Sequence, residues 1–147
     1  MGYTFTIGEL EVIKSEGDGL DCPCISFGAK GISLKGSPAF GEPTDSTNER
    51  WPSYCAWSDF LKDVELYDVF YSDNHLIGGH PGIRLVTKDL QKIVSQRLID
   101  FKTKHPELKP IFDEENKHAG SLCRLIWLDY WIEWALINCE TPVIANT

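Results

Sequence analysis

The stretch LCRLIWLDYWIEWALIN, from Leu122 to Asn138, is the longest apolar pattern with helical spacing in this sequence. Thirteen of the sixteen residues from Leu122 to Ile137 are apolar. A helix on a protein surface has one apolar stripe and one polar face, so a helix with this apolar density must be covered on most sides. The stretch therefore predicts a largely buried last helix around which the rest of the chain is organised.

The apolar residues of this helix fall on two faces when they are placed at about 100° per residue. The aromatic face consists of Cys123, Ile126, Trp127, Tyr130, Trp131, Trp134 and Ile137. The aliphatic face consists of Leu125, Leu128, Ile132, Ala135, Leu136 and Cys139. Large aromatic residues at helical spacing mostly supply core area, so we interpret the aromatic face as core and not as a cofactor or base-stacking site.

Two arrangements would bury both faces. In the first, the helix is sandwiched between a sheet and another helix. In the second, one face packs within the chain and the other contacts a second copy, with Leu128, Ile132 and Leu136 as the expected patch of a homo-oligomer. A membrane span is disfavoured, because it needs about 20 apolar residues and because Asp129 and Glu133 would each cost about 2.5 to 3.5 kcal/mol in the bilayer.

The first third of the chain predicts a small antiparallel sheet. Apolar and polar residues alternate from Tyr3 to Lys14, and the alternation changes phase at Gly8, which indicates a bulge or a bend. Two further short strands are predicted over Cys22 to Phe27 and Ile32 to Leu34, joined by a hairpin at Gly28 to Gly31.

Helical signals dominate the rest of the chain. Ser58 is predicted to cap a short helix over 59–64, and the aromatic segment Leu66 to Tyr71 favours a further strand. Thr87 is predicted to cap an amphipathic helix that ends at His105 and Pro106. Because the two long helices follow the strands, the order predicts one α+β domain over residues 1–147, with an N-terminal antiparallel sheet packed against two C-terminal helices.

Charge and cysteine content restrict the classes of partner. The net charge of −8 argues against direct nucleic-acid binding, which depends on basic surface, and permits a basic protein as partner. The five cysteines form no C-x-x-C pair, and the first residues carry neither a basic region nor an apolar run. We therefore expect a cytoplasmic protein.

The loop SDNHLIGGHPG, Ser72 to Gly82, is the most suggestive place for a ligand. It carries His75 and His80 beside two glycines that let a backbone approach a ligand closely. Arg84 and Lys88 follow at the start of the helix capped by Thr87, where free amides and the helix dipole attract anions. His75, His80, Arg84, Thr87 and Lys88 are accordingly the predicted ligand-binding residues, although a simple turn with solvated basic residues explains the same pattern.

Catalytic motifs are missing from the sequence. It contains no G-x-S-x-G, P-loop or G-x-G-x-x-G motif, and no H-E-x-x-H or zinc-knuckle spacing. The remaining enzymatic hypotheses are a thiol hydrolase that pairs Cys55 with His75 or His80, and a metal-dependent hydrolase built on the same histidines. We predict neither a catalytic residue, nor a metal, nor a cofactor.

The sequence thus favours a small acidic binding protein without catalytic activity. It would act by sequestering a small, nucleotide-like anion or by blocking a protein partner. The alternatives are a small hydrolase, or a structural subunit in which the long loop Gly36 to Ser53 and the aliphatic helix face contact neighbours.

Overall fold

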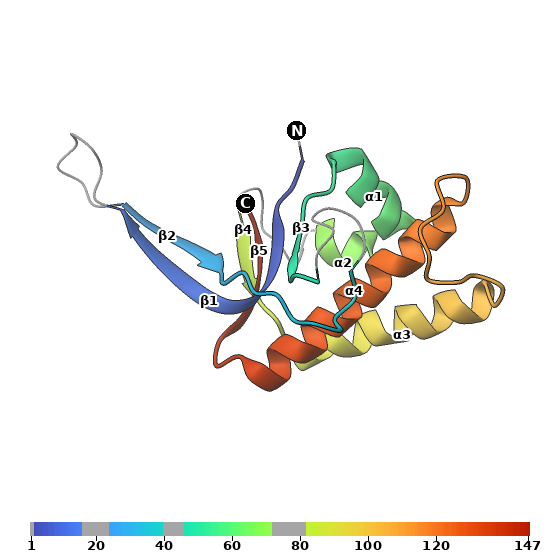
Figure 1. Ribbon diagram of the computed structural model, residues 1–147. Helices are drawn as coiled ribbons and strands as arrows, with labels where there is room; N and C mark the ends of the chain where they lie inside the picture. Colours follow the sequence, from blue (N-terminus) through green and yellow to red (C-terminus); the bar gives the residue numbers. More distant parts are fainter. Residues whose placement is uncertain (1, 16–23, 40–45, 72–81) are drawn as a thin grey trace.

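In the computed structural model, the helix α4 (Lys117–Asn138) lies between the sheet and a second long helix, α3 (Lys88–Lys104) (Figure 1). The structure describes residues 2–15, 24–39, 46–71 and 82–147. Besides α3, α4 contacts the strands β1 (Phe5–Ser15) and β5 (Pro142–Asn146) and the helix α1 (Tyr54–Asp63). Of the two arrangements considered for the apolar helix, the chain therefore adopts the one with sheet and helix on either side.

The sheet is antiparallel, and its strands come from both ends of the chain. Its order is β2-β1-β5-β4, with β2 spanning Cys24–Ala29 and β4 spanning Gly82–Leu85, and the two-residue β3 (Glu49–Arg50) also pairs with β1. The α+β class is confirmed, but the sheet is not confined to the N-terminal third as predicted. The C-terminal residues form an inner strand, because the short apolar run Val143 to Ala145 is buried between β1 and β4.

The strand β1 belongs to two structures at once. Its residues from Phe5 to Glu9 pair with β5 in the body of the protein, and those from Leu10 to Ser15 pair with β2. The second half of β1 and the whole of β2 form a two-stranded arm that extends away from the helices (Figure 1). The pairing with β5 is continuous through Gly8, so this glycine marks the end of the body sheet without forming a bulge.

The predicted strand over Ile32 to Leu34 and its hairpin at Gly28 to Gly31 are wrong. β2 pairs with β1, and the following segment runs along the body, where Ser33 makes only an isolated bridge to Thr47. Alternation over three residues was too short to distinguish a strand from a covering loop whose apolar side chains also face the core.

The predicted helix start at Ser58 and the predicted strand over Leu66 to Tyr71 are also wrong. α1 begins earlier, because the Ser53 hydroxyl accepts a hydrogen bond from the backbone N–H of Ala56 and so acts as the N-cap. The aromatic segment forms a short helix, α2 (Tyr67–Tyr71). Leu66 and Phe70 are spaced by one helical turn and are both fully buried, so packing overrode the strand preference of the aromatic residues.

The helix α3 matches its prediction. Thr87 is its N-cap and accepts a hydrogen bond from the backbone N–H of Leu90, and His105 is its C-cap. The side chains that join α3 to α4 are mostly apolar, but the Ser95 hydroxyl also donates a 2.6 Å hydrogen bond to Asp129 of α4. Among the residues described, no helix has the length and apolar content needed to span a membrane.

One hydrophobic cluster joins these elements. It includes side chains from β1, α1, α2, α3, α4 and β5, with Trp127 and Trp131 of α4 as its largest fully buried members. The Trp127 indole also donates a hydrogen bond to the backbone oxygen of Thr47, which fixes the covering segment to the central helix. The buried residues of α4 are Ala119, Gly120, Ser121, Leu122, Cys123, Leu125, Trp127, Leu128, Trp131, Ile132 and Ala135.

Candidate protein-binding surface

The arm formed by β1 and β2 exposes several large apolar side chains. Directly paired residues of an antiparallel ladder point to the same face, and successive pairs alternate between the two faces. The pairs Val12 with Phe27 and Lys14 with Ile25 therefore share one face of the arm, whereas Ile13 with Ser26 lies on the other. We call the face with Val12, Phe27 and Ile25 the apolar arm face.

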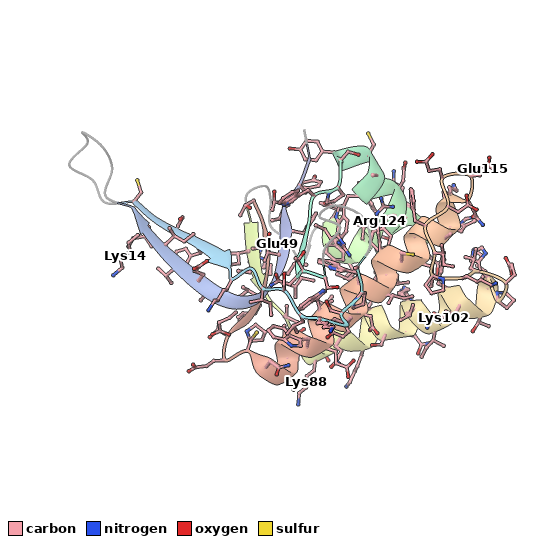
Figure 2. All side chains as sticks on the ribbon, viewed as in Figure 1. Lys14, Glu49, Lys88, Lys102, Glu115 and Arg124 are labelled. Atoms are coloured by element: carbon pink, nitrogen blue, oxygen red, sulfur yellow. The ribbon has the colours of Figure 1, made fainter. Side chains whose placement is uncertain are left out.

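Four large apolar side chains of the arm are about half accessible, whereas Leu10 at its base is partly buried. The exposed fractions are 48% for Val12, 54% for Phe27 and 56% for Ile25, and Ile13 on the opposite face is 48% exposed. No helix or strand among the described residues covers this two-stranded ribbon, which stands away from the body (Figure 2), and isolated hairpins are only marginally stable in water. Contiguous apolar side chains on a projecting element are typical of a surface that binds another protein.

The base of the arm is held by the side chain of Asn48, which is fully buried. Its amide donates hydrogen bonds to the carbonyl oxygens of Ile7, at 2.9 Å, and Lys30, at 2.8 Å. Its carbonyl oxygen accepts a 2.8 Å hydrogen bond from the backbone N–H of Ile32. One side chain thus ties the body half of β1 to the segment that follows β2, which fixes the point where the arm leaves the body.

Gly8 makes this approach possible. A Cβ atom at this position would lie 2.9 Å from the Asn48 amide nitrogen and 3.0 Å from the Lys30 oxygen. These separations are shorter than side chains tolerate, so the glycine is required by close packing and not by its backbone angles. The change of phase at Gly8 was the signal in the sequence, but the partner side chain was not predictable from it.

Glu9 anchors the other side of the arm base. Its two carboxylate oxygens accept hydrogen bonds from the backbone N–H of Thr141, at 3.0 and 3.2 Å. Burial and then the neighbouring Glu9 carboxylate raise the pKa of the Cys139 thiol. A raised pKa keeps this cysteine in its neutral form and argues against a nucleophilic role for it.

The ligand-binding residues predicted from the sequence are only partly placed. His75 and His80 lie outside the described residues. Arg84 is exposed on β4, Lys88 is exposed in the first turn of α3, and the Thr87 hydroxyl already caps that helix. The anion site at this helix start stays a prediction.

The predicted oligomer patch on the last helix is largely occupied within the chain. Leu128 and Ile132 are fully buried, and Leu136 is partly buried against the same core. The aliphatic face failed as an interface prediction because α3 already packs on α4, so the two central side chains of the patch are not available to a second copy.

The positions of the described residues do not support either enzymatic hypothesis. Cys55 is exposed in the first turn of α1, and both histidines with which it was paired fall in the segment 72–81, outside the described residues. The ranges described contain no group of three His, Cys, Asp or Glu side chains arranged to hold a metal ion.

A histidine pair that the sequence did not reveal lies where three helices meet. Both carboxylate oxygens of Asp63 on α1 lie 2.9 Å from Nδ1 of His118 on α4. The His118 ring stacks on His105 at the end of α3, with 4.5 Å between ring centroids. These contacts of Asp63, His105 and His118 fasten three helices together.

No protein-family model, no curated protein and no solved structure matches this chain.

Proposed function

We propose that this protein is a non-catalytic binding protein that blocks a basic protein partner by placing the apolar arm face against it. The observation that carries the proposal is the exposure of Val12, Ile25 and Phe27 on a ribbon that projects from the body. Burying an apolar side chain that is half accessible contributes about 1 kcal/mol, and an aromatic side chain contributes more. The three side chains together supply the apolar centre of an interface.

Charge identifies the chemistry of the partner. The whole chain carries a net charge of −8. Between Leu10 and Ala29 the sequence has four acidic residues, Glu11, Glu16, Asp18 and Asp21, and one basic residue, Lys14. Lys14 lies on the apolar arm face and Glu11 on the opposite one, so the choice of a basic partner rests on the net charge of the chain and not on charges beside the patch. Opposite net charges raise association rates and disfavour acidic competitors.

The test compares proteins captured by three forms of the chain from a lysate of its native cells. The forms are the wild type, Phe27→Ser on the arm, and Ile137→Ser as a matched control, because Ile137 is 73% exposed at the end of α4. We expect a basic protein that the wild type and Ile137→Ser retain and Phe27→Ser loses. With that partner purified, Phe27→Ser should raise Kd by about 5- to 30-fold, which corresponds to about 1 to 2 kcal/mol of apolar burial.

Three results would overturn the proposal. In the first, the wild type and Phe27→Ser retain the same proteins. In the second, the arm-dependent partner is acidic. In the third, light scattering shows a dimer that Phe27→Ser dissociates, which would assign the arm to self-association.

A further inference from the structure

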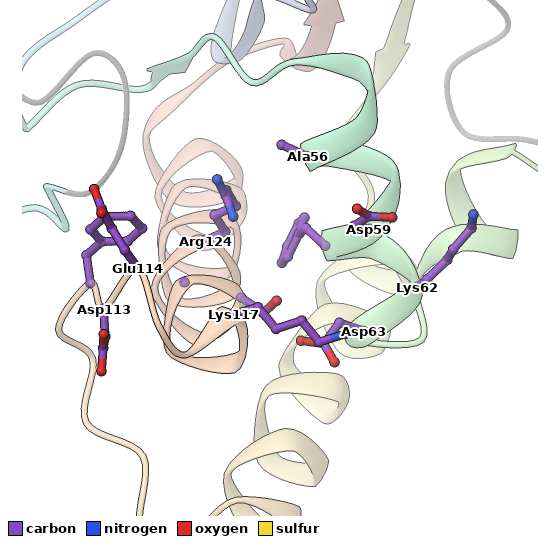
Figure 3. Close-up of a pocket in the computed structure, with 12 residues that line it drawn as sticks. Ala56, Asp59, Lys62, Asp63, Asp113, Glu114, Lys117 and Arg124 are labelled. Atoms are coloured by element: carbon purple, nitrogen blue, oxygen red, sulfur yellow. The ribbon is translucent and has the colours of Figure 1, made fainter.

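A cavity of about 680 Å³ opens between α1 and the N-terminal half of α4 (Figure 3), at the end of the molecule away from the arm (Figure 1). Residues of the two helices line it with the same spacing. From α1 these are Ala56, Asp59, Phe60 and Asp63, and from α4 they are Lys117, Gly120, Ser121 and Arg124. Spacings of i, i+3, i+4 and i+7 place each set on one face of its helix, so two helical faces oppose each other across the cavity.

Small residues on both faces create the space, at the start of the α1 face and in the middle of the α4 face. Ala56, Gly120 and Ser121 occupy positions where longer side chains would fill the gap. A Cβ atom at Gly120 would lie 3.6 Å from Nη1 of Arg124 and 3.9 Å from two carbons of the Phe112 ring, so the guanidinium and the ring both lie close to the helix surface at this glycine. The volume lies within the range of about 300 to 1,000 Å³ that is typical of small-molecule sites.

The α4 face offers groups for an anion. Ser121 is 4% exposed and lines the cavity. Arg124, one turn further along, points into the cavity (Figure 3). A serine hydroxyl and a guanidinium on one helix face can bind the same carboxylate.

The α4 side of the cavity carries charges of both signs: Lys117 and Arg124 are basic, and Asp113 and Glu114, which precede α4, are acidic (Figure 3). Burial, and then the charge of Arg124, lower the pKa of the neighbouring Arg50 to about 10. Burial also lowers the pKa of Arg124 itself. Because Arg50 keeps its proton at neutral pH and lies in the field of Arg124, an anion bound at Arg124 would reduce the repulsion between the two guanidinium groups.

The α1 face carries the opposite charge. Asp63 is engaged by His118, and Lys62, which also lines the cavity, has its ammonium group 5.2 Å from the centre of the Tyr67 ring. Asp59 makes no hydrogen bond or ion pair within the described segments, and it projects from α1 toward the same space as Arg124 (Figure 3). A carboxylate opposite the arginine disfavours a simple anion such as phosphate and favours a ligand with charges of both signs.

We propose that this cavity binds a small zwitterion with an apolar body, which is the chemistry of a free apolar amino acid. Arg124 and Ser121 would bind its carboxylate, Asp59 would bind its ammonium group, and its side chain would lie against Phe60 and Phe112. Phe112 is 53% exposed at the edge of the cavity, where an apolar ligand would cover it. This site does not involve the arm, so Phe27→Ser should bind the amino acid with the same affinity as the wild type.

Isothermal titration tests the two charged contacts separately. The probes are L-leucine, L-methionine and L-phenylalanine, each also as its N-acetyl derivative, which lacks the ammonium group, and as its amide, which lacks the carboxylate. We expect saturable binding of at least one free amino acid and at least tenfold weaker binding of both derivatives. Arg124→Gln should weaken binding of the free amino acid and abolish the difference in affinity between the free amino acid and its amide. Asp59→Asn replaces an exposed side chain, so it should not disturb folding. It should abolish the difference in affinity between the free amino acid and its N-acetyl derivative.

The control variant is Lys102→Gln, which removes one exposed positive charge from α3 at a residue that does not line the cavity (Figure 2). It should bind the amino acid as the wild type does. Any of four results would overturn the proposal. They are no binding of any free amino acid up to its solubility limit, unchanged affinity in Asp59→Asn, equal binding of inorganic phosphate, or a loss of affinity in Lys102→Gln as large as that in Arg124→Gln.

Discussion

Replacing Asn48 by alanine should destabilise the whole protein, because its side chain makes three buried or partly buried hydrogen bonds at the base of the arm. The Ile7 carbonyl would lose its bond in the core, and a buried polar group without a partner costs about 1 to 3 kcal/mol. Lys30 is exposed and Ile32 is partly buried, so water can replace part of their bonds, each worth about 0.5 to 1.5 kcal/mol. We expect a loss of about 2 to 4 kcal/mol, a large fraction of the 5 to 15 kcal/mol typical of a domain.

Urea denaturation followed by tryptophan fluorescence measures this loss as a shift of the midpoint at constant slope. Asn48→Asp separates hydrogen bonding from packing, because it keeps the size and the acceptor but replaces the donating amide with a carboxylate oxygen facing two carbonyl oxygens. It should be at least as destabilising at neutral pH. Ser26→Ala is the control, since that hydroxyl makes a single 3.5 Å bond on the exposed arm and should change stability by less than about 0.5 kcal/mol. If Asn48→Asp has the same free energy of unfolding as the wild type, the reasoning is refuted.

Three further changes test other parts of the fold. Glu65 has φ of 59°, a left-handed conformation that costs a side-chain-bearing residue about 1 kcal/mol, so Glu65→Gly should raise the free energy of unfolding by up to that amount in urea denaturation. Ser95→Ala removes the hydrogen bond to Asp129 between α3 and α4 and should cost about 1 to 2 kcal/mol, measured in the same way; no change would mean that water replaces the hydroxyl. Burial raises the pKa of Tyr71, so the folded chain holds this proton at a pH where the unfolded chain, whose tyrosine pKa is about 10, releases it. The contribution of Tyr71 to the free energy of unfolding is therefore complete below a pH of about 10 and is lost as the pH rises further. Tyr71→Phe should make the free energy of unfolding fall less steeply in that range.

Elements with strong local signals were predictable from the sequence. The helix α3 has apolar residues at regular spacing and a capping threonine, and both act within one turn of the chain. The strand β1 and the helix α4 were recognisable for the same reason, since their alternation or apolar density extends over more than ten residues. The α+β class followed from these three elements.

Short segments were not predictable, because their apolar side chains suit several structures. Leu66 to Tyr71 became a helix since a spacing of four residues buries Leu66 and Phe70 together. The C-terminal residues became an inner strand since β1 and β4 offer them two edges. In both cases the partners, and not the local sequence, determined the backbone conformation.

The sequence by itself determined the acidic charge, the helical centre of the fold and the residues that cap α3. Only the tertiary structure decided which apolar side chains remain accessible. Leu128 and Ile132 looked like an interface and are covered by packing in the core, whereas Val12 and Phe27 looked like ordinary strand residues and are exposed because their half of the sheet extends beyond the helices. The cavity likewise needs α1 and α4, which are separated by more than fifty residues, to face each other. Exposure and juxtaposition depend on long-range contacts, and periodicity in a sequence reports only the nearest turns of the chain.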